Sequence, residues 1–215
     1  MDKLATLLVL ADGRLPTGAH AHSGGLEAAC ADGRVRDLDT LAEFLRGRLA
    51  TAGLVAAGFA AAAARDPDRW AELEEELDAR TPSPAQRRAS RAQGRALMRA
   101  GRALWTVPAE PDAPHHAVAL GLVAAAAGLD PEHAALTAAY GSVTGPASAA
   151  VKLLSLDPYR VHALLAGLAD ACGNTARRAG VERAGVEQKL PAASAPLLDL
   201  GAEDHATWEV RLFAS

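Results

Sequence analysis

Apolar residues recur along most of the chain at three- and four-residue spacing, which is the period of a helix that buries one face. A glycine-rich loop over 18–25 separates a first short helix from a second one over 26–31. The apolar face of the first helix is formed by Leu4, Leu7, Leu8 and Ala11.

Pairs in which Asp or Ser precedes proline mark several helix starts, because the first residue caps free N–H groups and proline fits the first helical position. They stand at 66–67, 83–84, 130–131 and 157–158. Thr40 and Glu43 have the spacing of a capping box. Together with a break at Gly145-Pro146, these signals predict helices over 40–65, 67–79, 84–104, 115–127, 131–140, 146–155 and 158–179.

Beyond Val186 the pattern changes, because Pro191 and Pro196 interrupt it and the last ten residues alternate polar and apolar groups. We expect an extended segment that lies on another surface. The sequence predicts an all-α fold, a single-domain bundle of about eight to ten helices over 1–190. An extended C-terminal tail over 191–215 joins that domain when it is ordered.

Composition strengthens the helical prediction. About a quarter of the residues are alanine, isoleucine is absent and aromatic residues supply 4%. Alanine favours helices, whereas strands select β-branched and aromatic residues. Small residues also recur along 47–61, which indicates either a buried central helix of the monomer or the seam of a dimer.

The net charge of −4 gives no basic footprint for nucleic acid. The apolar run near the start is too short for a signal peptide. The longest uncharged run, 49–64, falls short of the roughly 18 residues that span a membrane. We therefore expect a cytoplasmic protein, with no nucleic-acid or membrane partner, whose Cys30 and Cys172 are buried as small apolar residues.

Charged residues gather in two neighbouring predicted helices. Acidic residues occupy 72–78, and six arginines recur at three- and four-residue spacing over 87–102. One interpretation is an antiparallel hairpin whose acids face the arginines. The other is a face that docks a partner, since arginine is enriched at protein interfaces.

Catalytic motifs are absent from the sequence: it contains neither a phosphate-binding loop nor a nucleophile elbow, so we assign no catalytic residue, no metal ligand and no cofactor. Two alternatives rest on histidines. A free-standing nickel-binding protein would use His20, His22 and His115. An all-α enzyme would use His22 and His116 as acid and base groups.

Several segments together resemble UreF-type urease accessory proteins. The first is the N-terminal loop, which reads Leu15-Pro16-Thr17-Gly18-Ala19 and then His22-Ser23-Gly24-Gly25-Leu26-Glu27. Further similar segments follow in order at 88–95, 116–129, 148–153, 196–199 and 211–215. The resemblance runs from about residue 4 to the last residue.

The resemblance implies a dimeric, all-α scaffold for urease maturation that is not an enzyme. Such proteins bridge a UreD/UreH-type accessory protein and the GTPase UreG, and regulate GTP-dependent nickel delivery to apo-urease. The tail would become ordered on the UreD/UreH-type partner and would be mobile in the isolated protein.

Family roles transfer to matching positions. Arg211 matches the tail arginine tied to GTPase recruitment, with Leu212 and Phe213 as flanking anchors, and Lys152 matches a basic position facing the GTPase. The sequence departs from the family pattern at His20 and Ala214. The residues assigned to partner binding are Arg211, Leu212, Phe213, Ser215, Lys152 and His205. The residues assigned to shaping the loop are Pro16, Gly18, His22, Ser23 and Glu27.

Overall fold

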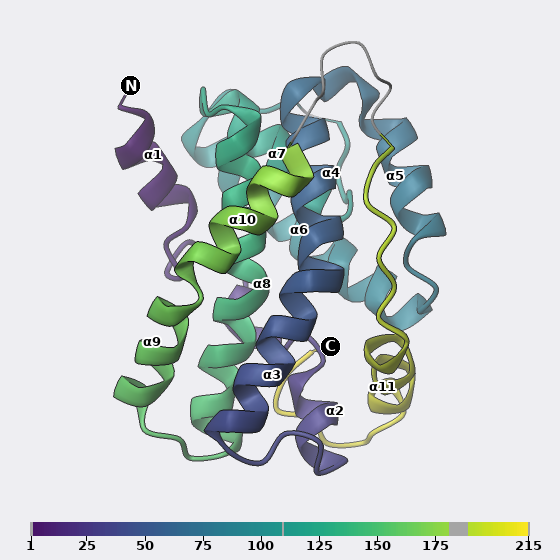
Figure 1. Ribbon diagram of the computed structural model, residues 1–215. Helices are drawn as coiled ribbons and strands as arrows, with labels where there is room; N and C mark the ends of the chain where they lie inside the picture. The colour runs from purple at the N-terminus through teal and green to yellow at the C-terminus, as the bar shows by residue number, and fades with distance from the viewer. Residues whose placement is uncertain (1, 109, 181–188, 215) are drawn as a thin grey trace.

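The computed structural model describes residues 2–108, 110–180 and 189–214. These residues form a helical bundle, which confirms the all-α prediction (Figure 1). The helices are α1 (Lys3–Leu10), α2 (Leu26–Ala31), α3 (Leu38–Arg48), α4 (Leu54–Arg65), α5 (Trp70–Ala79), α6 (Pro84–Leu104), α7 (His116–Ala126), α8 (Pro131–Leu153), α9 (Pro158–Gly167), α10 (Ala169–Gly180) and α11 (Pro196–Ala206).

Three shorter segments complete the helical structure: two 3₁₀ turns, Ala19–Ala21 and Pro67–Arg69, and a π-helical segment, Leu49–Gly53. The π-helical segment joins α3 to α4, so that one continuous helix runs over Leu38–Arg65. With this junction, the described residues hold ten helices, within the predicted range.

The core of the bundle lies around α4, which packs against α7, α8 and α10. Phe59 is fully buried, as are most of the alanines of α4. The axes of α4 and α7 approach closely at Gly121, where an added Cβ would collide with the carbonyl oxygen of Ala60. The small residues of α4 therefore serve the core of the monomer, as the first interpretation predicted, whereas Gly47 and Ala50 in the preceding turns are exposed.

The helix Leu38–Arg65 is long and apolar enough to cross a membrane by composition alone. Of its most apolar window, however, 61% is buried inside the bundle. Alanine-rich helices at the centre of a helical protein have this property, so the burial explains the high hydropathy.

Residues 131–153 form a single helix, so the predicted break at Gly145-Pro146 is wrong. Proline lacks the N–H that would bond to the carbonyl four residues earlier, which here is that of Ser142. The Nε of Arg48 donates to this carbonyl oxygen at 3.0 Å. A side chain from α3 thus satisfies the group that proline leaves free, and the helix continues.

Three further helix predictions need correction. The capping box of α3 is formed by Asp37 and Thr40, so the helix begins at Leu38 and Thr40 lies within its first turn. The predicted helix over 158–179 is divided at Leu168, directly after Gly167. The tail over 191–215 is not wholly extended, because Pro196 begins α11 at its first position instead of ending a segment.

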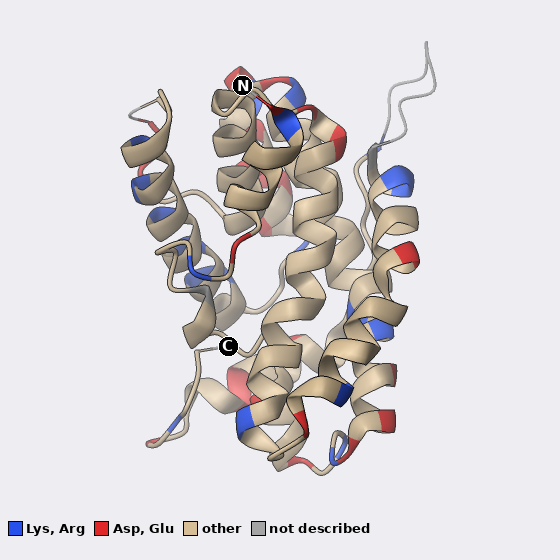
Figure 2. Ribbon diagram, turned by 90° about the vertical axis from the view of Figure 1, so that its left-hand side faces the viewer, with Lys and Arg blue, Asp and Glu red and all other residues tan. Residues whose placement is uncertain are grey.

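Acids of α5 face two arginines of α6, so the hairpin interpretation holds only for the first part of the arginine stripe, whereas Arg95 and Arg102 lie closer to Asp112. Arg91 of α6 lies 2.8 Å from Asp78 of α5, and Arg87 lies 3.7 Å from the same carboxylate. Figure 2 shows the basic residues of α6 repeating along the helix at the left-hand edge of the view. Arg99, farther along α6, is exposed.

Candidate functional site

The C-terminal segment after α11 docks on the N-terminal loop and on α2. Figure 1 shows it, in yellow, leaving α11 and ending near the purple α2. A parallel β-bridge pairs His22 with Ala214. In this bridge the Ser23 N–H donates to the Ala214 carbonyl oxygen at 3.0 Å, and the Ala214 N–H donates to the Ala21 carbonyl oxygen at 2.6 Å. The N-terminal loop and the C-terminal segment are therefore joined through their backbones.

Glu27, in the first turn of α2, holds the same segment from the other side. Its side chain is nearly buried, and its carboxylate accepts the backbone N–H groups of Leu212 at 2.8 Å and Phe213 at 2.9 Å. The Nε2 of His205 lies 2.9 Å from the same carboxylate. A buried carboxylate needs several donors to offset the loss of water, and three groups of the C-terminal segment supply them. We call Glu27 with these three partners the tail clasp.

His205 is fully buried, and its ring packs against Trp208 with 4.7 Å between centroids. We expected His205 to contact a partner, but in this structure it has no surface to offer. In this conformation its ring holds the tail against Glu27, and its assignment to partner binding stays a prediction.

Arg211 is exposed, directly before the two residues that the tail clasp fixes. Phe213 is buried and lies under Lys152, whose Nζ is 5.9 Å from the ring centroid. Leu212, in contrast, is 70% exposed, so only Phe213 is an anchor of the kind that we predicted for both. Ser215 lies outside the described residues.

The predicted loop-shaping residues lie around this docking site. Ser23 is fully buried, and its Oγ accepts the N–H of Glu27 at 3.3 Å, at the start of α2. Gly18 has a φ of +70°, in the left-handed region that favours glycine. Pro16 is exposed and His22 is half-buried. The structure thus brings Ser23, Glu27 and His22 to the tail, whereas Pro16 lies at the surface of the loop.

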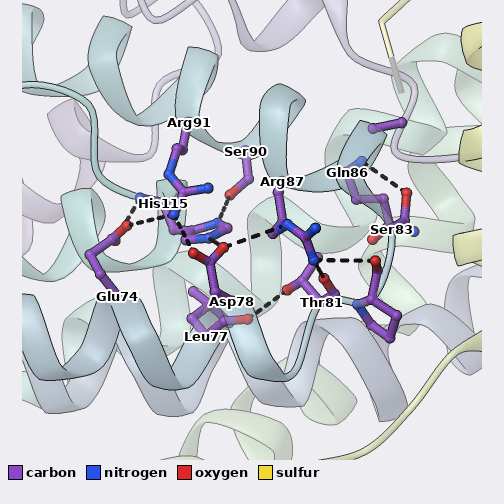
Figure 3. A network of polar contacts seen from close by, with 12 residues as sticks. Glu74, Leu77, Asp78, Thr81, Ser83, Gln86, Arg87, Ser90, Arg91 and His115 are labelled. Carbon is purple, nitrogen blue, oxygen red and sulfur yellow. Dashed lines mark hydrogen bonds and ion pairs between the residues drawn. The ribbon is translucent and has the colours of Figure 1, made fainter.

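A second polar cluster, in which α5, α6 and the start of α7 meet, is centred on the buried His115 (Figure 3). The two ring nitrogens of His115 lie 2.9 Å from Ser90 Oγ and 3.0 Å from Asp78 Oδ1. Its backbone N–H donates to Glu74 at 2.7 Å, and the N–H of His116 donates to Ser90 Oγ at 3.1 Å. We call these five residues and Arg91 the His115 cluster.

The charges in the His115 cluster follow from its surroundings. The hydrogen bond from Arg91 lowers the pKa of Asp78 to about 2, so this carboxylate is ionised and can only accept. Burial lowers the pKa of His115, which keeps the ring neutral. The proton of the ring therefore lies on Nε2, and Ser90 donates to Nδ1. Burial raises the pKa of Glu74.

This arrangement bears on the two histidine alternatives. Both ring nitrogens of His115 are engaged, so His115 cannot join His20 and His22 as a nickel ligand without breaking the cluster. Within the described residues no group of three or more potential ligands could hold a metal ion. Burial, followed by the charge of His22, lowers the pKa of His116 to about 4, and burial also lowers that of His22.

Sequence reasoning missed the tail clasp and the His115 cluster, because both join residues that are far apart in the chain. Glu27 in the first turn of a helix has the ordinary appearance of an exposed residue that favours the helix dipole. The residues next to Glu27 in the sequence carry no signal that residues 205–213 cover its side chain. Ser90 likewise lies among arginines on a helix that carries polar residues in every turn.

Comparison with known proteins shows the family of this chain. A model of the UreF family matches residues 35–169. The urease accessory protein UreF of Mycobacterium marinum is 49% identical over 219 residues, and that of Mycolicibacterium vanbaalenii is 48% identical over 224, each covering 100% of both chains. The UreF of Mycobacterium tuberculosis H37Rv is 45% identical over 223 residues, again over 100% of both chains. The chain therefore belongs to the UreF family of urease accessory proteins, which are non-catalytic chaperones.

Proposed function

We propose that this chain is a cytoplasmic scaffold that bridges a UreD/UreH-type accessory protein and the GTPase UreG. Within that complex it would regulate the GTP-dependent delivery of nickel to apo-urease. Its membership of the UreF family supports a role in urease maturation. The sequence has no phosphate-binding loop, which agrees with a GTPase partner that supplies the nucleotide chemistry.

The observation that carries this proposal is the placement of Arg211 by the tail clasp. Glu27 fixes the backbone N–H groups of the next two residues, so the position of Arg211 in the chain is set although its side chain is exposed. The Nζ of Lys152 lies over the ring of Phe213, which is two residues after Arg211 in the chain. An exposed guanidinium next to residues whose backbone is held in place suits an acidic surface of a partner, because Arg pairs with carboxylates in a bidentate way.

The C-terminal part also exposes large apolar side chains, which supports a second protein contact. In α11 and the segment after it, four such residues are between 62% and 83% exposed. Exposed apolar groups that gather in one region are typical of protein interfaces. They are Leu197, Leu200, Val210 and Leu212. We assign this region to the UreD/UreH-type partner.

We further propose that the scaffold acts as a homodimer, so that each complex presents two copies of the Arg211 surface. Closed twofold symmetry is the commonest arrangement of soluble oligomers. Sedimentation equilibrium of the purified chain tests this point: a mass of one chain at micromolar concentration would refute it.

Co-expression of the urease subunits with the UreD/UreH-type protein, UreG and this chain tests the function as a whole. We expect urease activity and bound nickel to fall to background when this chain is left out, and to return when it is supplied from a second plasmid. Full activation without the chain would overturn the assignment. The same cells expressing the chain with a stop codon at position 191 report whether the C-terminal part is needed.

A further inference from the structure

A partly open cavity of about 210 Å³, with both polar and apolar walls, lies between the N-terminal loop, the ends of α3 and α5, the first half of α6, the start of α7 and α11. This volume is many times the roughly 10–15 Å³ that one water requires. Its polar wall includes His22, Arg48, Arg80, Gln86, Gln93 and Asp199. Neither the tail clasp nor the proposed partner contacts use this space.

Arg48 supplies the first reason to regard the cavity as a binding site. Its guanidinium donates to two carbonyl oxygens, of Ser142 at 3.0 Å and Gly24 at 2.7 Å. Within the described residues no carboxylate lies within ion-pair distance of it. Desolvation lowers the pKa of Arg48 to about 10, yet the group stays charged at neutral pH. Arg48 is half-buried, and its guanidinium has two carbonyl acceptors but no carboxylate partner within the described residues, so it can bind an anion.

Two further polar atoms in the cavity wall are buried without a hydrogen-bond partner, namely the Nε of Arg80 and the Nδ1 of His22. An arginine Nε–H can only donate, so it requires an acceptor. The rest of the Arg80 guanidinium is engaged, because it lies 2.8 Å from Glu76 and 5.3 Å from the ring centroid of Phe59. Unsatisfied buried polar groups are rare in proteins, and here two of them belong to residues that line the same pocket.

The position of Arg48 is set by the local fold. The residue ends α3 at the junction with the π-helical segment Leu49–Gly53. Gly24, with a φ of +61°, packs against the guanidinium: an added Cβ would lie 3.0 Å from its Cζ. Pro146 leaves the Ser142 carbonyl free to accept from Arg48. Three separate features of the backbone thus hold one cation at the edge of the cavity.

We infer that this cavity binds a small free oxyanion, of the class of inorganic phosphate or sulfate, between Arg48 and Arg80. Such an ion carries several acceptor oxygens, which match the unpartnered Arg80 Nε–H and the charge of Arg48. The amides of Gln86 and Gln93 supply further donors in the same wall. Asp199 is the carboxylate among these wall residues, and Arg80 is paired with Glu76, so Arg48 is the guanidinium of this wall that has no carboxylate partner within the described residues.

The inference is tested on the full chain with inorganic phosphate as the probe, at constant ionic strength maintained with chloride. We expect phosphate to raise the melting temperature in a saturable manner and to give one binding event per chain by isothermal titration calorimetry. Glycerol 2-phosphate serves as a bulkier phosphate, which separates a free ion from a phosphate carried on a larger molecule.

The matched variants are Arg80→Gln and Arg69→Gln. Both lose an ion pair with an acidic residue of α5, but only Arg80 lines the cavity. We expect Arg80→Gln to weaken phosphate binding roughly tenfold or more, as loss of a charged hydrogen bond does, and Arg69→Gln to leave it unchanged. Arg48→Lys keeps the positive charge but loses the planar set of N–H donors, so we expect it to weaken phosphate binding as well.

Three results would overturn the inference. They are the absence of a saturable effect of phosphate over chloride, equal weakening by Arg80→Gln and Arg69→Gln, and preferential binding of glycerol 2-phosphate. The inference does not rest on the proposed function, because none of these measurements involves urease or another accessory protein.

Discussion

The carboxylate of Glu27 and the Nε2 of His205 lie 2.9 Å apart, although 178 positions separate the two residues in the chain. Through this contact α2 holds α11, and through the backbone N–H groups of Leu212 and Phe213 it also holds the end of the chain. A single buried side chain thus determines where the C-terminal segment lies. The expectation that the tail acquires its path only on a partner needs revision, because its own chain supplies a docking site.

Glu27→Ala removes the acceptor from three donors at once. We expect it to lower the free energy of unfolding by about 2–3 kcal/mol, because buried N–H groups lose their partner, and to speed proteolysis of the C-terminal segment. Urea denaturation and limited proteolysis measure the two effects. The control is Glu43→Ala, an exposed position on α3. Equal digestion of the two variants would contradict the role of the tail clasp.

Ser90→Ala tests the His115 cluster. The hydroxyl both donates to His115 Nδ1 and accepts the N–H of His116, so its loss leaves two polar groups inside the protein without a partner. We expect a destabilisation of about 1–3 kcal/mol by urea denaturation. Ser148→Ala, at an exposed position of α8, is expected to stay within about 0.5 kcal/mol of the parent. A similar result for both would show that the cluster contributes no net stability.

Gly94 and Gly141 form a matched pair of helical glycines. An added Cβ at Gly94 would overlap the carbonyl oxygen of Pro114, whereas nothing lies within 4 Å of one at Gly141. We expect Gly94→Ala to destabilise the protein by more than about 3 kcal/mol or to prevent folding. Gly141→Ala is expected to stabilise it by about 0.5–1 kcal/mol through helix propensity. Melting temperatures of the two variants provide the measurement.

The lowered pKa of His116 predicts a loss of stability in acid. Its pKa is about 4 in the folded chain against 6.5 in the unfolded one, so between these values the unfolded state binds more protons. The contribution of His116 to the free energy of unfolding is therefore complete above pH 6.5. It falls as the pH decreases toward 4, by about 1.4 kcal/mol for each pH unit. Urea denaturation from pH 7.5 to 4.5 measures this.

The matched variants are His116→Gln and His20→Gln, since His20 is exposed. His116→Gln should lose less stability than the parent over this range, whereas His20→Gln should follow the parent. Parallel curves for all three proteins would show that His116 does not carry the effect.

Local signals in the sequence predicted most of the helices, because caps and proline positions act within a few residues. Ser83 and Asp157 cap the helices that were predicted to begin after them. The same signals gave wrong predictions where a group far away in the sequence altered the local hydrogen bonding. Pro146 stays inside α8 because Arg48, almost a hundred residues earlier, satisfies the carbonyl that proline frees. Pro196 begins α11, whereas the sequence pattern predicted that it interrupts the tail.

The site itself was predicted only in part. The family resemblance assigned Arg211 and Lys152 to partner binding and Ser23 and Glu27 to shaping the loop, as two separate groups. The structure brings Ser23, Glu27 and Lys152 to the C-terminal segment that carries Arg211. What each residue does was beyond the sequence. His205 is buried where a surface residue was expected, because burial depends on which segments cover it and not on its neighbours in the chain.

Capture of UreG by the complex of this chain with the UreD/UreH-type protein tests the central claim most directly. Surface plasmon resonance with GTP and nickel present would compare the parent with Arg211→Ala, and with Arg99→Ala as an exposed arginine elsewhere. We predict that Arg211→Ala keeps the melting temperature of the parent within about 2 °C, since surface changes are near neutral, and lowers UreG affinity at least roughly tenfold. Arg99→Ala should leave it unchanged. Undiminished capture by a folded Arg211→Ala variant would contradict the account.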